Sequence, residues 1–171
     1  MSQAQQQSKQ ELRHWLQQHQ HCFTHAITLT LTPPYATSAG AQTVCRRFQH
    51  KFNKAILGGG RTKAQLAELA WVGVVHGNAG KQQRYHIHVA VGGFPPRLDL
   101  MELLKRFKTT AKHTDGVWRQ VYFWPIEHDG WNENGYSRYI TRLIRDGNDE
   151  AVLVDGISWG QQDNSVDRNT I

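Results

Sequence analysis

The sequence predicts an α+β fold with an antiparallel central sheet and helices packed on one face. Residues 23–35 alternate apolar and polar side chains, the period-two pattern of a half-buried strand. Residues 41–57 instead place apolar side chains at helical spacing. Along the chain the predicted elements follow the order β-α-β-β-α-β-α. The first six are those of a split βαβ, ferredoxin- or RRM-like sheet, whose second face is free to act.

Length and composition favour one globular domain spanning residues 1–171. The chain has 171 residues, of which 39% are hydrophobic and 20% charged. Residues 1–20 form a polar helix or arm, and residues 149–171 a C-terminal tail. No apolar run is long enough to span a membrane, and the N-terminus lacks the apolar segment of a signal peptide. We therefore expect a cytoplasmic protein with no membrane partner, whose Cys22 and Cys45 are reduced thiols.

The first strand has one apolar and one polar face. Since successive strand side chains point to opposite faces, one face carries Ile27, Leu29 and Leu31, and the other Thr28, Thr30 and Thr32. Pro33 and Pro34 end this strand.

The same patterns predict the remaining elements. The helix over 41–57 ends at the glycines 58–60. In chain order there follow strands over 68–76 and 84–94 joined by a hairpin loop, a helix over 98–113, a strand over 116–126, a helix over 131–147 and a short strand within 151–159.

Two histidines interrupt the apolar strand "YHIHVAVGG". His86 and His88 share the face opposite Tyr85, Ile87 and Val89, about 7 Å apart along the strand. They are either an incidental polar face or half of a metal site. His76 ends the preceding strand and is the candidate third ligand, although it could simply cap the hairpin. Three neutral imidazoles that leave coordination positions open are typical of a catalytic metal site.

A formal charge of +6 and a pI of about 9.5 point toward a polyanionic partner, with nucleic acid first. The alternative is that the charge serves only solubility. Basic residues follow both long helices: Arg46, Arg47, Lys51, Lys54, Lys105, Arg106, Lys108 and Lys112. Most of these belong to solvated faces.

Three stretches in order, "AITLTLTPP", "VVHGNAGKQQRYHIHVAV" and "GYSRYITRLI", resemble the motifs of the HUH endonuclease superfamily. The resemblance covers about Phe23 to Ile144 and is closest to nuclease domains of rolling-circle replication initiators (Rep). It implies an HUH nuclease fold in which His76, His86 and His88 hold Mg²⁺ or Mn²⁺. A histidine at position 76, where initiators often carry an acidic residue, departs toward the relaxase pattern.

The resemblance also implies a reaction and partners. A tyrosine attacks single-stranded DNA at an origin hairpin or nick site of a plasmid or phage, leaving a covalent 5′-phosphotyrosine link. The same site can rejoin the strands. Since no Walker motif occurs, the host would supply a helicase, together with a polymerase.

Two tyrosines on the helix over 131–147 compete for the nucleophile's role. Tyr136 lies in the apolar stripe with Ile140, which favours packing. Tyr139 lies off that stripe and matches the family's Tyr-x-x-Lys pattern, with Arg142 in place of lysine. Arginine keeps the charge and can grip a phosphate. We therefore predict Tyr139 as nucleophile, with Tyr136 as a less favoured second tyrosine.

Further predicted contacts concern DNA. The polar strand face with Thr28 and Thr30, and the cations that flank the hairpin, Lys81 and Arg84, are DNA-binding candidates. Tyr122 and Trp124 either stack on unpaired bases or pack into the core, because alternation does not say which face is inward. The spare-ligand candidates His113, Glu127 and His128 are weaker.

Three other functions remain open. A relaxase or transposase would use the same chemistry. A non-catalytic RRM-like module would need exposed aromatic residues on the inner strands, where this chain has threonines and histidines. A metal-dependent hydrolase that uses water would not need Tyr139.

Overall fold

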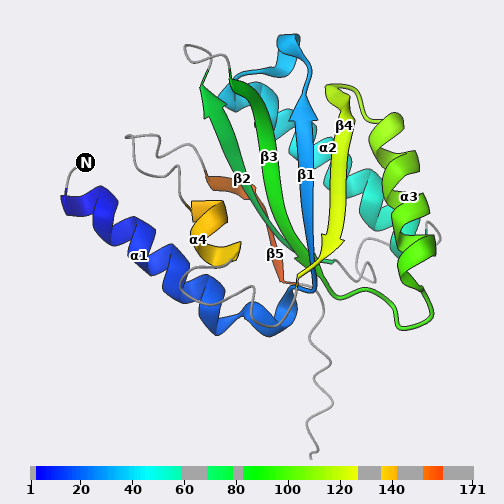
Figure 1. Ribbon diagram of the computed structural model, residues 1–171, viewed down its shortest axis with the longest axis horizontal. Helices are drawn as coiled ribbons and strands as arrows, with labels where there is room; N and C mark the ends of the chain where they lie inside the picture. The colour runs from blue at the N-terminus through cyan, green and yellow to red at the C-terminus, as the bar shows by residue number, and fades with distance from the viewer. Residues whose placement is uncertain (1–2, 59–68, 79–82, 127–135, 142–151, 160–171) are drawn as a thin grey trace, which may run out of the picture.

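A sheet of five antiparallel strands forms the centre of the computed structural model (Figure 1), which describes residues 3–58, 69–78, 83–126, 136–141 and 152–159. The strands are β1 (His25–Leu31), β2 (Ala70–Asn78), β3 (Gln83–Gly92), β4 (Val117–Pro125) and β5 (Val152–Trp159). Their order across the sheet is β4-β1-β3-β2-β5. The first four strands have the split βαβ order predicted from the sequence, and β5 extends the sheet beyond β2.

In the described part of the chain, four α-helices and two short 3₁₀ turns accompany the sheet. They are α1 (Gln3–Gln18), α2 (Ser38–Leu57), α3 (Leu100–Lys112) and α4 (Tyr136–Thr141), with turns at Gln20–Cys22 and Pro33–Tyr35. The Thr37 and Asp99 side chains cap α2 and α3 by accepting from the backbone N–H groups of Gly40 and Glu102. Gly58 ends α2 with a positive φ of 90°, a conformation that glycine adopts without strain.

The larger core lies between the sheet and the helices α2 and α3. The β1 residues Ile27, Leu29 and Leu31 pack there against Phe48 and Phe52 of α2. The apolar side chains of β3 join them, as the alternation predicted: Ile87, Val89 and Val91. The predicted faces of β1 and β3 are therefore confirmed.

The other face of the sheet corrects one prediction. Instead of lying free, this face is partly covered by α1 and α4, which lie on the side of β2 and β5 in Figure 1. Leu16 of α1 and Tyr136 and Ile140 of α4 form a second core with strand residues, among them Val72 and Val74. The prediction of helices on one face only was wrong because these valines and helix side chains together have apolar surface to bury.

The two cysteines are free thiols, as expected. Cys45 is buried and Cys22 is partly buried. Burial raises the pKa of the Cys45 thiol to about 12, so this side chain is an unreactive part of the core. Among the described helices, none has the length and apolar character that crossing a membrane requires.

Candidate metal centre

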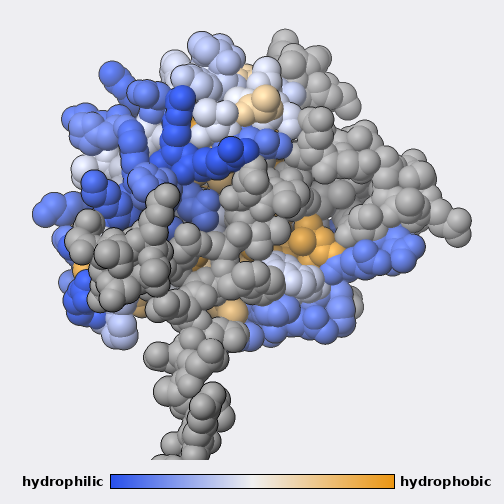
Figure 2. Space-filling model, turned by 180° about the vertical axis from the view of Figure 1, so that it is seen from behind, coloured by the Kyte–Doolittle hydropathy of each residue, from blue (hydrophilic) through white to orange (hydrophobic). Residues whose placement is uncertain are grey.

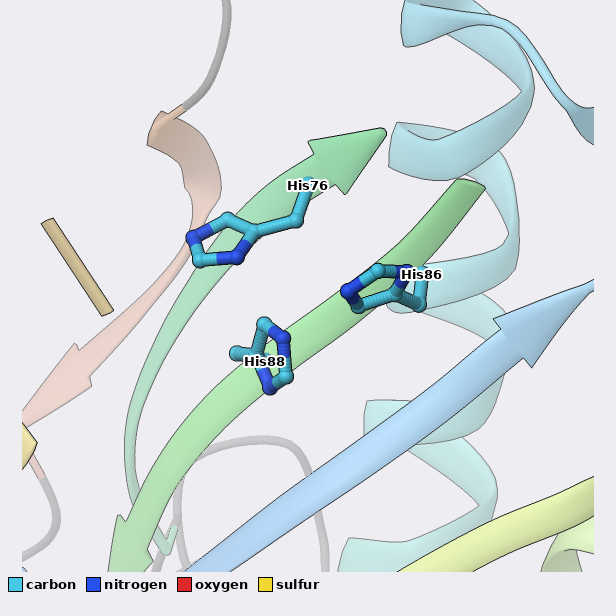
Figure 3. Close-up of side chains that lie close together, drawn as sticks. All are labelled: His76, His86 and His88. Carbon is cyan, nitrogen blue, oxygen red and sulfur yellow. The ribbon is translucent and has the colours of Figure 1, made fainter. Parts of the chain in front are cut away.

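The β2–β3 hairpin brings three histidines together. His76 of β2 lies directly opposite His86 of β3, and His88 follows two residues later on the same face. The antiparallel register therefore produces the cluster of His76, His86 and His88, called the triad below. Figure 3 shows the three imidazoles grouped on the side of the strands that faces away from α2. We call this side of the sheet the triad face.

The triad comes close to the spacing of a metal site. One nitrogen from each ring can be chosen so that all three lie within 4.8 Å of one another. Two nitrogens that share an ion lie about 3 to 4 Å apart, given metal–nitrogen bonds of about 2.1 Å. Small ring rotations would close the difference, so the three histidines could bind a metal ion.

Burial distinguishes the three rings. His76 and His88 are each 1% exposed, whereas His86 is only partly buried. The rings of His76 and His88 have centroids 4.4 Å apart, and those of His86 and His88 lie 4.7 Å apart. Solvent thus reaches the triad mainly at His86, where further ligands could enter.

Two hydrogen bonds orient the buried rings. His76 Nε2 lies 2.9 Å from the carbonyl oxygen of Ile140. A carbonyl oxygen only accepts, so Nε2 carries the proton and Nδ1 is the atom left for a metal. His88 Nδ1 lies 2.9 Å from Thr28 Oγ1, which leaves Nε2 as its ligand atom. Such bonds on the far side of a ligating imidazole fix its tautomer and orientation.

The hydrogen bond from His76 ties helix α4 to the triad. Tyr136, at the start of α4, is 8% exposed and donates its hydroxyl to the Val89 carbonyl oxygen at 2.9 Å. At the other end, Arg13 Nε of α1 donates to Thr141 Oγ1 at 2.7 Å. The predicted packing role of Tyr136 is confirmed, and its hydroxyl is engaged with the backbone.

Several predicted site residues lie outside what the structure describes. Tyr139 is within α4, but its side chain is not among the described ones, nor is that of Arg84 in β3. Arg142, Lys81 and the spare-ligand candidates Glu127 and His128 lie outside the described residues. The exposed His113 caps the end of α3 and does not belong to the triad.

The two predicted DNA-binding residues of β1 lie in a more buried environment than expected. Thr28 and Thr30 are 8% and 7% exposed, so both hydroxyls lie at the level of the triad and not at the surface. Thr28 holds His88, a role that the sequence alone did not suggest. The DNA contacts of these threonines stay a prediction.

The basic residues of α2 lie away from the triad. Arg46, Arg47, Lys51 and Lys54 are exposed on the helix that covers the opposite sheet face. Figure 2, seen from that side, is largely hydrophilic where it is coloured. These cations therefore form a solvated face, as expected.

No protein family, curated protein or solved structure matches the chain.

Proposed function

We propose that this protein is a metal-dependent endonuclease and strand-transferase of the HUH type, which acts on single-stranded DNA at a replication origin. One observation carries the proposal: the Ile140 carbonyl oxygen of α4 accepts a hydrogen bond from His76 of the triad. Residue 139 is the chain neighbour of residue 140, so the backbone of the candidate nucleophile is held next to the candidate metal site. The order of motifs in the sequence supports the same conclusion.

The donor set favours Mn²⁺ over Mg²⁺. Imidazole nitrogens suit transition metals, whereas Mg²⁺ prefers oxygen ligands from carboxylates and water. Here all three donors are histidines. We therefore propose Mn²⁺ as the working ion, with Zn²⁺ and Ni²⁺ binding more tightly because affinity rises along the first transition row.

A bound ion would polarise the scissile phosphate and stabilise charge on its oxygens. The proposed reaction itself exchanges one phosphate ester for another. The Tyr139 oxygen loses its proton to solvent and forms a bond to phosphorus. The bond from phosphorus to the 3′ oxygen breaks, and that oxygen takes up a proton to become a 3′ hydroxyl. The reverse reaction, with an incoming 3′ hydroxyl, joins strands without another energy source.

Two further residues have supporting roles in this proposal. Arg142 contributes positive charge near the phosphate, where a guanidinium can bind two oxygens at once. Tyr136 holds α4 on the sheet through its bond to the Val89 carbonyl. A buried phenol already bonded to the backbone is a poor nucleophile, which supports Tyr139 over Tyr136.

The test is an incubation of the protein with pooled single-stranded oligonucleotides and Mn²⁺, followed by mass spectrometry of protein-linked DNA. We expect a nucleotide on the peptide that contains Tyr139. Tyr139→Phe should abolish the adduct while keeping the fold and DNA binding. Tyr136→Phe is the matched control, because it removes a hydroxyl from the same helix and should keep most of the activity.

Two results would contradict the proposal. An adduct on Tyr136, or one that survives in Tyr139→Phe, would reject the assigned nucleophile. Metal-dependent cleavage without any adduct would indicate a hydrolase that uses water.

A further inference from the structure

Strand β4 exposes a row of aromatic rings. Trp118, Tyr122 and Trp124 are 42%, 50% and 37% exposed, although large aromatic side chains usually bury most of their surface. They alternate with Val117, Val121 and Phe123, which pack against the larger core. Tyr122 and Trp124 lie opposite Thr28 and Ala26 of β1 and therefore on the triad face, and we call these two rings the aromatic surface.

Strand register connects the aromatic surface to the triad. Thr28 of β1 lies opposite His88 on one side and opposite Tyr122 on the other. Tyr122 is thus two strands away from His88, a distance of about 10 Å. Trp124 lies opposite Ala26 in the neighbouring row. Because Ala26 has a small side chain, the Trp124 ring is the larger member of this cross-strand pair.

The two rings nearest the triad are held apart from each other. The ring centroids of Tyr122 and Trp124 lie 6.4 Å apart with the ring planes at 68°. An edge-to-face pair leaves at least one face of each ring uncovered by the other. Gln120 donates a hydrogen bond to the Tyr122 hydroxyl at 2.8 Å. This bond holds the edge of the phenol and does not cover the face of its ring.

The charge beside β4 complements a polyanion. Helix α3 packs on the opposite face of the sheet but runs next to β4 at this edge (Figure 1), where it exposes Lys105, Lys108 and Lys112. Arg119 of β4 is exposed as well. Residues 100–125 contain five basic and two acidic side chains, and one of the acidic ones, Glu102, is paired with Arg106. A strand with bases on the rings could direct its phosphates toward this basic edge.

We infer that the aromatic surface of β4 binds the unpaired bases of single-stranded DNA next to the reacting phosphate, with Tyr122 and Trp124 as stacking residues. This inference rests on the proposed function for the position of the reacting phosphate, but binding itself requires no chemistry. Bases stack on aromatic side chains whatever their sequence, and cations track the backbone. Duplex DNA hides its base faces and cannot use this surface.

The test measures binding in EDTA, so that it does not depend on metal or cleavage. Fluorescence anisotropy compares a labelled oligothymidylate with an abasic strand of the same length. We expect the wild type to prefer the strand with bases. Tyr122→Ala and Trp124→Ala should each weaken binding to that strand by about 5- to 100-fold, the range for losing one stacked base. Neither should change binding to the abasic strand much.

Met101→Ala is the matched control, since Met101 is 73% exposed on α3 and offers no ring. Trp124→Phe should restore part of the loss, because a smaller ring can still stack. Equal affinity of wild type and both alanine variants would overturn the inference. A change in oligomeric state on sedimentation, with DNA binding unaltered, would overturn it too and would identify β4 as an interface between copies.

The two proposals fail separately. Ring-dependent binding in EDTA without any adduct in Mn²⁺ would support the aromatic surface and reject the nuclease. An adduct that forms equally well in the alanine variants, with unchanged binding in EDTA, would support the nuclease and reject the aromatic surface.

Discussion

The triad face has two halves, one covered by helices and one open to solvent. In the half formed by β2 and β3, helices α1 and α4 cover the sheet, and two of the three histidines are buried. In the half formed by β4, the rings of Tyr122 and Trp124 remain exposed.

The difference shows how one sheet can hold some side chains in fixed positions and leave others exposed to solvent. In the covered half, hydrogen bonds to Thr28 and to the Ile140 carbonyl hold two of the imidazoles. These side chains therefore lose little conformational freedom when a ligand binds. In the inference above, the open half offers ring faces on which any unpaired base could stack. Four predictions test whether the covered half behaves as an organised metal site.

The largest effect is expected from removing two ligands. His86→Ala combined with His88→Ala should lower Mn²⁺ affinity by at least about 100-fold, because each histidine supplies one of only three donors in the triad. Titration calorimetry measures the affinity, and circular dichroism verifies the fold. His50→Ala, an exposed histidine on α2, is the control. Unchanged affinity in the double variant would mean that the ion binds elsewhere.

Two isoleucine variants distinguish a loss of protein stability from a loss of organisation at the metal site. Ile140 of α4 and Ile56 of α2 are both 0% exposed, but they belong to different cores. Each change to alanine should cost about 2 to 5 kcal/mol in urea unfolding. Only Ile140→Ala should also weaken Mn²⁺ binding, by about tenfold, since it loosens the helix that holds His76. Equal metal affinities in the two variants would show that α4 is not coupled to the triad.

Thr28→Val removes the hydroxyl that bonds to His88 Nδ1 while keeping the shape of the side chain. We expect Mn²⁺ affinity to fall by about 10- to 100-fold, as for other residues that orient a ligating histidine. Thr28→Ser should keep most of the affinity, because it retains the hydroxyl. If the valine and serine variants bind alike, Thr28 contributes only packing.

The smallest effect concerns the attachment of α4 to α1. A double-mutant cycle of Arg13→Ala and Thr141→Val should give a coupling free energy of about 1 to 2 kcal/mol in urea unfolding, as expected for a hydrogen bond from a charged donor. A coupling near zero would show that this hydrogen bond does not contribute to the attachment of α4.

Much of the triad and of the core could be predicted from sequence, because strand geometry is local. Alternation alone assigned His86 and His88 to one face and Ile87 and Val89 to the other. Helical spacing likewise assigned Tyr136 to packing. These assignments hold because the pleat and the helical turn set side-chain directions before any tertiary contact forms.

Only the tertiary structure decided what covers each face. Alternation divides the residues of β4 into two sets, but packing determines which set meets solvent, so Tyr122 and Trp124 could not be assigned from the sequence. Two hydrogen bonds, one between Thr28 and His88 and one between Ile140 and His76, join residues that lie 60 and 64 positions apart in the sequence. Contacts over such separations depend on how strands that are distant in the sequence pair and on how helices dock, which the pattern within one segment does not determine.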